Sequence, residues 1–230
     1  MPRTLALFDI DGTLVAPPSS EVRFTRWLFA QGRLGPRRLL AYVLRLPERV
    51  VNAGTMALKT NKAHLAGFDS DELAGLVEEF LDAAGDSPWI PEARARLEVH
   101  RERGDEVVLL TGTPDLVAAS LARRLSADAW FASILDRKDG RITASPPHQH
   151  PHGHAKLDIA RRLAVERGVR LEDAWAYGDA WGDRHLLSAV GHPVAVWPCR
   201  RLLRLARLKG WECLAAPPGA PRQRPATGDT

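Results

Sequence analysis

The sequence predicts an α/β fold in which a Rossmann-like, mostly parallel sheet carries helices on both faces and receives an inserted helical cap. Three observations lead to this prediction. Short apolar runs alternate with longer segments of helical periodicity, as in parallel strands joined by crossover helices. Three of these runs lead directly into glycine and polar residues. Between residues 15 and 88, helical periodicity dominates and β-branched runs are few.

Four apolar runs are expected at the centre of the sheet, near residues 4–8, 107–110, 174–177 and 193–196. The core is therefore predicted to combine residues 1–16 and 88–216. Residues 17–87 are predicted to form the helical cap, and the proline-rich residues 217–230 a disordered tail.

The first apolar run leads into Asp9-Ile10-Asp11-Gly12-Thr13-Leu14. On an extended backbone, residues i and i+2 point to the same side, so Asp9 and Asp11 are expected to project together from the carboxyl end of the strand. Two carboxylates this close need a cation or a shared proton. One reading is a nucleophile beside a proton-transferring acid, with a hard metal ion that holds a phosphate. The other is a surface turn, since similar spacing occurs in calcium loops and hairpins.

Three later segments supply what phosphoryl transfer through an aspartate requires. Thr111-Gly112-Thr113 follows the second strand, where a hydroxyl and a glycine N–H can donate to phosphoryl oxygens. Lys156 opens a helical pattern, and its ammonium can pair with a carboxylate and a phosphate. Asp179 and Asp183 follow the third strand, in a spacing that suits Mg²⁺.

In this order, the four motifs resemble those of the haloacid dehalogenase superfamily of hydrolases. The motifs are D-x-D-G-T-L, a T-G-x loop after a strand, a helix-opening lysine and G-D-x-x-x-D. The long insert, Tyr177 before the last motif, and the ending Gly191-His192-Pro193 resemble its phosphoserine-phosphatase-like branch (subfamily IB), whose members carry a C1-type helical cap.

The resemblance implies roles for the motif residues in catalysis. Asp9 would attack phosphorus and become an aspartyl phosphate. Asp11 would protonate the leaving alkoxide and then deprotonate the water that hydrolyses the intermediate. Thr111 and the Gly112 amide would bind the phosphoryl group, while Lys156 would neutralise developing charge.

The resemblance also implies a Mg²⁺ cofactor. Asp9, Asp179 and the main-chain carbonyl of Asp11 would hold the ion, with Asp183 as a further acidic group. Asp11 additionally argues for a phosphatase, because relatives that act on carbon–halogen bonds lack this second carboxyl.

The substrate is less defined by the sequence. Phosphoserine phosphatases have a cap glutamate, a cap arginine and an asparagine just before the last motif aspartate. Here Pro18 stands at the glutamate spacing, and Gly182, preceded by the bulky Trp181, replaces the asparagine. Glu21 lies three residues late and has Arg23 nearby. Glu21, Arg23 and Trp181 are therefore the candidate contacts of substrate and cap. We therefore expect a small phosphorylated substrate, which is phosphoserine-like, an amino-alcohol phosphate or a lipid-derived phosphate.

Two other functions remain open at this stage. A phosphotransferase would pass the same aspartyl phosphate to an acceptor other than water. A catalytically idle protein would bind membranes or anionic partners through residues 21–50, which hold seven arginines against two glutamates. We rank this second alternative last, because all of the acidic motif residues are present and an idle protein would have no need of them.

The composition indicates an enzyme of one core with an insert, and Cys199 and Cys213, which form no C-x-x-C pattern, fit a reducing cytoplasm. The chain is 45% hydrophobic and 26% charged, and no apolar run is long enough to cross a bilayer. A net charge of +4 without a recognisable nucleic-acid module predicts no specific nucleic-acid partner. Peripheral membrane contact through the basic stretch is the less favoured reading, and the oligomeric state is not predicted.

Four histidines alternate between His148 and His154, shortly before Lys156. In an extended segment they would share a face, as ligands of a transition metal do. The favoured alternative is a loop near the site, because no cysteine or carboxylate completes the ligand set. A hairpin centred on Asp139-Gly140 is expected to bring this segment to the site.

Overall fold

The computed structural model describes residues 4–35, 62–85 and 89–220 of the 230-residue chain. Its centre is a six-stranded sheet in the order β3-β2-β1-β6-β7-β8, and all neighbouring strands are parallel. The strands are β1 (Leu5–Phe8), β2 (Glu106–Pro114), β3 (Ala129–Ser133), β6 (Trp175–Gly178), β7 (His192–Val196) and β8 (Glu212–Leu214). The four expected strands are β1, β2, β6 and β7, and β3 and β8 extend the sheet at its edges.

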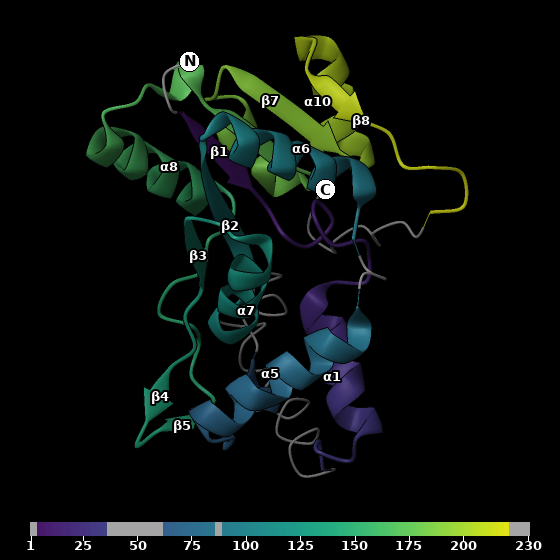
Figure 1. Cartoon of the computed structure of the whole chain (residues 1–230), viewed down its shortest axis with the longest axis vertical. Coiled ribbons are helices and arrows are strands. Elements are labelled where there is room, and N and C mark those ends of the chain that lie inside the picture. Colours follow the sequence, from purple (N-terminus) through teal and green to yellow (C-terminus); the bar gives the residue numbers. More distant parts are fainter. Residues whose placement is uncertain (1–3, 36–61, 86–88, 221–230) are drawn as a thin grey trace.

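Helices cover both faces of this sheet, as the sequence predicted (Figure 1). Ala6 and Phe8 of β1 belong to one apolar cluster, whereas Leu5 and Leu7 belong to another, because successive residues of a strand face opposite sides. Helices α6 and α7 pack in the first cluster, and α8, α9 and α10 in the second. Their bounds are α6 (Pro91–Arg103), α7 (Asp115–Leu125), α8 (His154–Arg167), α9 (Arg184–Leu187) and α10 (Arg200–Lys209). In the described ranges, no helix has the length and apolarity needed to cross a membrane.

Strand β1 occupies the point at which the strand order reverses. The chain continues from β1 to β2 and β3 on one side, and later returns to β6, β7 and β8 on the other. Loops at the carboxyl ends of strands flanking such a point form a crevice. The loops that follow β1, β2 and β6 therefore converge at one end of the sheet.

The insert between β1 and α6 contains α1 (Ser20–Ala30), a short 3₁₀ helix η1 (Ala63–Leu65) and α5 (Ser70–Ala84). Ser19 caps α1 by accepting a hydrogen bond from the Val22 N–H, and Asp69 caps α5 in the same way. Phe24 of α1 packs against Phe80 of α5, with ring centroids 5.3 Å apart. Residues 36–61, which hold much of the basic stretch, and the end of the predicted tail lie outside the described residues.

The predicted hairpin is confirmed by the antiparallel strands β4 (Arg137–Lys138) and β5 (Arg141–Ile142). Asp139 and Gly140 both have positive φ, of 51° and 75°, as a tight two-residue turn requires. The hairpin lies beside α5, because the Ser70 N–H donates to the Gly140 carbonyl at 2.8 Å. Figure 1 shows α1, α5 and this hairpin at the same end of the molecule.

A buried polar contact ties α6 to β6 through His100. Its Nδ1 lies 2.8 Å from the Asp105 carboxylate, and its Nε2 lies 2.8 Å from the hydroxyl of Tyr177. The carboxylate accepts from Nδ1–H, so a neutral ring accepts the tyrosine proton at Nε2. Burial lowers the pKa of His100, which favours this neutral form. Tyr177 also stacks on Phe8, with ring centroids 4.1 Å apart.

We expect Tyr177→Phe to lower the free energy of unfolding by about 1–3 kcal/mol, because the buried Nε2 of His100 would lose its donor. The stacking on Phe8 would be retained, so the loss reports the hydrogen bond. Urea unfolding at pH 7 measures it, with the double variant Tyr177→Phe/His100→Leu as the matched comparison. If Tyr177→Phe were as stable as the wild type, the hydrogen bond would contribute nothing.

Candidate active site

The loop after β1 directs its two carboxylates to different partners. The Asp9 N–H continues the strand ladder by donating to the Tyr177 carbonyl at 3.1 Å, which holds Asp9 at the strand end. The chain then turns sharply at Gly12, whose φ of 93° is readily adopted only by glycine. The loop closes through a 2.7 Å hydrogen bond from the Gly12 N–H to the Val15 carbonyl.

Asp9 belongs to a cluster of three acidic side chains. Ligand oxygens of Asp9, Asp179 and Asp183 all lie within 4.8 Å of one another. Nζ of Lys156, near the start of α8, lies 3.0 Å from Asp9 and 2.7 Å from Asp183. The Lys156 side chain is 4% exposed and that of Asp9 is 12% exposed, so these charges interact in a largely water-excluded space. The structure therefore brings together four of the predicted site residues.

The single positive charge of Lys156 does not balance the three carboxylates of this cluster. Burial raises the pKa of Asp9 to about 7, with Asp183 adding to the rise and Lys156 opposing it. The pKa of Asp179 is raised well above its usual range by burial and then by Asp183 and Asp9. Burial alone would lower the pKa of Lys156, but the two carboxylates raise it instead. A divalent cation would relieve this repulsion.

The donor set fits a hard metal ion. Carboxylate oxygens are the ligands that Mg²⁺ prefers. Asp183 is also used structurally, since its Oδ2 accepts from the N–H groups of Asp179 and Ala180, and its Oδ1 accepts from Lys156. A Cβ on Gly178 would lie 2.6 Å from Cβ of Asp183, so only glycine fits there. Asp179 and Asp9 are therefore the better placed ligands, and the predicted Mg²⁺ site remains a prediction.

Asp11 is held away from the acidic cluster. Its Oδ1 accepts from the Ser20 N–H at 2.7 Å, and its Oδ2 accepts from the Thr113 hydroxyl at 2.7 Å. Burial raises the pKa of Asp11, although these two hydrogen bonds oppose the rise. Its side chain is not a member of the three-acid cluster. The predicted metal contact through its main-chain carbonyl is separate from this and remains untested.

Thr111, Gly112 and Thr113 lie beside these carboxylates near the carboxyl end of β2, which continues to Pro114, so the expected loop after residue 110 is part of the strand. The Thr111 hydroxyl donates to the Thr113 hydroxyl at 2.9 Å, and the Thr113 N–H donates back to the Thr111 hydroxyl at 3.2 Å. The single proton of the Thr111 hydroxyl is therefore directed to Thr113, not outward. Binding of a phosphoryl oxygen by Thr111, as predicted, would require this hydroxyl to rotate.

The candidate cap contact Glu21 forms an ion pair within the insert. Its carboxylate pairs with Lys62, whose side chain is 4% exposed, and lies 3.9 Å from Nε2 of His64. Burial and the Lys62 charge lower the pKa of His64 to about 4. Glu21 follows directly on Ser20, the residue whose N–H binds Asp11. Lys62 and His64 were not predicted, because their distance from Glu21 in sequence gives no signal of the contact.

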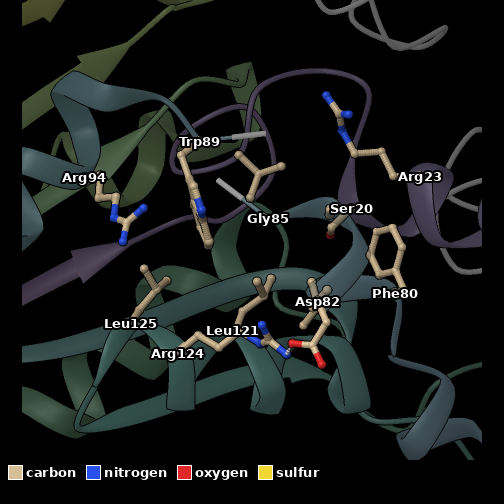
Figure 2. Close-up of a pocket in the computed structure, with 13 residues that line it drawn as sticks. Ser20, Arg23, Phe80, Asp82, Gly85, Trp89, Arg94, Leu121, Arg124 and Leu125 are labelled. Carbon is tan, nitrogen blue, oxygen red and sulfur yellow. Dashed lines mark hydrogen bonds and ion pairs between the residues drawn. The ribbon is translucent and has the colours of Figure 1, made fainter. Parts of the chain in front are cut away.

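Arg23 is engaged by the backbone that leads into α1. Its guanidinium donates to the carbonyls of Ala16, Pro17 and Pro18 at 3.2, 3.1 and 2.9 Å. Arg23 also lines a cavity of about 290 Å³ between the insert and the core. Figure 2 shows this cavity, with Trp89 projecting into it near Gly85. In this structure Arg23 thus stabilises the connection, and its predicted contact with substrate is untested.

Trp181, the other candidate substrate contact, lies in the loop between Asp179 and Asp183. Its ring is 4.5 Å from the guanidinium carbon of Arg184 and 4.4 Å from that of Arg201. These cation–π contacts orient the ring from two elements, α9 and α10. Its role toward substrate remains a prediction.

The alternating histidines contact different partners. His148 binds Asp136, His150 binds Ser133, and His154 stacks on His185 with ring centroids 3.5 Å apart. The three-acid cluster is the only group in the described ranges with three metal-binding side chains close enough to share an ion. The histidine segment is therefore a loop beside the site, and the transition-metal interpretation was wrong for the residues that the structure describes.

Thr13, Ser20 and Thr113 are positioned at the site without having been assigned roles. Thr13 donates to Oδ1 of Asp179 at 3.2 Å, while the other two bind Asp11. Thr13 and Thr113 both stand within recognised motifs, so their position in sequence was a usable signal. Ser20 had none, because its N–H is the contacting group.

We expect Mg²⁺ to raise the melting temperature of the wild type and to do so much less in Asp179→Asn. At about 100 times its Kd, a ligand adds about 2.7 kcal/mol, which is about 5–10 °C for a chain of this size. Without metal, Asp179→Asn should melt higher than the wild type, because one buried like charge is removed. Thermal melts with Mg²⁺ and with a chelator measure both effects. Asp158→Asn on the exposed face of α8 is the control, and an equal Mg²⁺ shift in Asp179→Asn would contradict the assignment.

We expect His64 to make stability depend on pH. A base whose pKa is about 4 in the folded protein and about 6.5 when unfolded holds fewer protons when folded. Stability is therefore lost as the pH falls from about 6.5 to about 4, by about 3 kcal/mol. Urea unfolding of the wild type and His64→Gln across this range measures the effect. A stability difference between them that stays constant with pH would rule it out.

Comparison with known proteins identifies relatives that match most of the chain. The family model of haloacid dehalogenase-like hydrolases matches residues 6–188. A curated relative is phosphoserine phosphatase SerB1 of Mycobacterium tuberculosis, which is 34% identical over 214 residues covering 90% of this chain and 69% of that protein.

Solved structures show the same fold. A protein of unknown function from Bordetella pertussis superposes with a TM-score of 0.78 at 28% identity, covering 93% of this chain and 99% of that one. A substrate-bound phosphoserine phosphatase superposes with a TM-score of 0.65 at 19% identity, covering 94% of both chains, which shows a likeness of fold. As its motifs predicted, the chain belongs to the haloacid dehalogenase-like hydrolase family, and within it resembles the phosphoserine phosphatases.

Proposed function

We propose that this hydrolase is a Mg²⁺-dependent phosphomonoesterase that works through an aspartyl-phosphate intermediate. The observation that carries the proposal is the separation of Asp9 and Asp11 into two environments. Asp9 contacts Lys156 within the acidic cluster, whereas Asp11 is bound by Ser20 and Thr113 outside it. Two carboxylates in different environments are suited to different roles, here a nucleophile and a proton donor.

In the first step, an Asp9 oxygen forms a bond to phosphorus and the bond from phosphorus to the ester oxygen breaks. Asp11 gives its proton to that leaving oxygen, a role supported by burial that raises its pKa. Lys156 lies 3.0 Å from Asp9 and neutralises charge on the transferring group. The Gly112 N–H and a rotated Thr111 hydroxyl would donate to the phosphoryl oxygens.

In the second step, water attacks the phosphorus of the aspartyl phosphate. Asp11, now a carboxylate, takes a proton from this water, and the bond between phosphorus and the Asp9 oxygen breaks to release inorganic phosphate. Asp11 is thereby returned to its protonated form and Asp9 to its carboxylate. The same residue thus serves as acid and then as base.

Asp9 and Asp179 would hold the Mg²⁺ ion, with Asp183 orienting the loop and Lys156. When bound, the ion offsets the negative charge of the carboxylates and the phosphate. Thr13 would orient Asp179 through the 3.2 Å hydrogen bond that it donates. The buried acidic cluster, in which Lys156 alone leaves two carboxyl pKa values raised, supports this assignment.

We propose a small organic phosphate as substrate, with phosphoserine-like, amino-alcohol and lipid-derived phosphates as the candidates. The name of the M. tuberculosis relative favours phosphoserine. Glu21, which pairs with Lys62, directly follows Ser20 in the sequence, and the N–H of Ser20 binds Asp11. A substrate ammonium would compete with Lys62 for Glu21, so a preference for amine-containing esters would identify Glu21 as a contact. Cytoplasmic location, the absence of a nucleic-acid partner and peripheral membrane contact stay predictions.

We expect Asp9→Asn to abolish phosphate release from every ester, because no nucleophile remains. Asp11→Asn should lower kcat by about 10²- to 10⁴-fold on alkyl phosphates such as phosphoserine. On p-nitrophenyl phosphate, whose leaving group needs no proton, the loss in the first step should be much smaller. Phosphate release with Mg²⁺ and with a chelator measures turnover, and the initial burst of leaving-group release measures the first step.

The outcomes of this experiment are separable. Turnover retained in Asp9→Asn would contradict the aspartyl-phosphate mechanism. Equal losses in the first step, measured as leaving-group release, on alkyl and aryl esters in Asp11→Asn would contradict its role as the acid. Added alcohol acceptors test for a transferase, because phosphoryl transfer would appear as new ester instead of free phosphate.

A further inference from the structure

His150 packs directly against Gly112, near the carboxyl end of β2. A Cβ placed on Gly112 would lie only 3.0 Å from Cε1 of His150, so the imidazole occupies the space that a side chain would need. The φ of Gly112 is not in the left-handed region, and the requirement for glycine there is therefore one of space. The same segment approaches the other loop, where a Cβ on Gly182 would lie 2.8 Å from Cε1 of His152.

The backbone holds this segment in register with the end of β3. The Ile134 N–H donates to the Gln149 carbonyl at 3.1 Å, and the His148 N–H donates to the Ile134 carbonyl at 3.0 Å. This pairing starts one residue after Ser133, the last residue of β3. His150 and Ser133 are thereby placed side by side, with Nδ1 of His150 2.6 Å from Oγ of Ser133.

Counting protons assigns the direction of each hydrogen bond. The Ser133 hydroxyl lies 2.7 Å from the Gly112 carbonyl oxygen, which can only accept. The single hydroxyl proton is therefore used in that bond. It follows that the short contact with His150 is made by an Nδ1–H that donates to the serine oxygen. Ser133 is fully buried, so these bonds do not exchange freely with water.

The other side of the same peptide unit leads to Asp11. The Thr113 N–H, which shares a peptide plane with the Gly112 carbonyl, donates to the Thr111 hydroxyl at 3.2 Å. That hydroxyl donates to the Thr113 hydroxyl at 2.9 Å, which in turn donates to Asp11 at 2.7 Å. The peptide unit is thus held from one side by Ser133 and from the other by Thr111.

We propose that His150 and Ser133 are positioning residues that set the Gly112–Thr113 peptide in the orientation in which Thr113 reaches Asp11. Neither side chain has to touch the reacting atoms. They act through a chain of hydrogen bonds. It runs from His150 to Ser133 and the Gly112–Thr113 peptide, and from there through the hydroxyls of Thr111 and Thr113 to Asp11. This inference rests on the proposed function of Asp11, and it adds two residues that lie outside the four motifs.

The test uses variants of His150 that separate shape from hydrogen bonding. His150→Phe keeps a ring against Gly112 but removes the donor, whereas His150→Asn can place an N–H where Nδ1 stood. Ser133→Ala breaks the next bond of the relay. His148→Asn is the matched control, because this histidine belongs to the same segment and binds Asp136 on the exposed side.

On phosphoserine we expect His150→Phe and Ser133→Ala to lower kcat by about 10- to 100-fold with a smaller change in KM, as a misplaced catalytic group does. In the first step, measured as leaving-group release, the loss should shrink on p-nitrophenyl phosphate, whose leaving group needs no proton from Asp11. His150→Asn should recover most of the activity. The double variant His150→Phe/Ser133→Ala should lose no more activity than either single variant, because both substitutions break the same chain of contacts.

A thermal melt with Mg²⁺ accompanies each variant and shows that the acidic cluster is intact. Wild-type kcat in a folded His150→Phe, equal losses in the first step on both esters, or multiplicative losses in the double variant would each overturn the inference. Asp9→Asn is assayed in parallel. If it retains turnover, the proposed function itself fails, whereas its inactivity beside an unaffected His150→Phe would reject the positioning role alone.

Discussion

The rest of this structure depends on the convergence of buried carboxylates at the carboxyl end of β1. Asp9, Asp179 and Asp183 lie within 4.8 Å of one another, and the only cation placed among them in the described ranges is Lys156. Like charges in such a space raise one another's pKa values unless positive charge is added. The glycine at position 178, the hydrogen bonds to Asp183 and the position of α8 all serve to hold this one arrangement. The proposed metal ion would relieve the electrostatic cost of this arrangement.

The features that follow from local pattern were predictable from the sequence. Strands β1, β2, β6 and β7 are short apolar runs followed by turn residues, and the carboxyl ends of parallel strands meet at one edge. This reasoning predicted that Asp9, Thr111 and Asp179 lie near one another, whereas the site role of Lys156, which lies near the start of a helix, came from the resemblance to the family. The edge strands β3 and β8 were not predicted, since they are short and only partly buried, and are defined by pairing with a neighbour.

Contacts between distant segments were not predictable in the same way. The pairing of Glu21 with Lys62 depends on how the insert folds, and Arg23 was expected to face substrate but binds three backbone carbonyls. The histidines suggested a metal site because alternation places side chains on one face of an extended strand. The segment instead places His150 beside Gly112 and His152 beside Gly182, while His148 binds Asp136 and His154 contacts His185. A periodic sequence pattern predicts which way side chains point only where the backbone forms a regular strand or helix.

The hydrogen bond from Ser20 to Asp11 joins the insert to the chemistry of the core. Ser20 is the first residue of α1, and Arg23 ties the same turn to the carbonyls of the connecting segment. This turn and its connection are therefore expected to move as one body. Any displacement of α1 must stretch the bond to Asp11 and so change how readily that carboxyl releases its proton. A movement of the insert can thus change the pKa of Asp11. The contact is made by the backbone N–H of Ser20, which a substitution of the Ser20 side chain leaves in place.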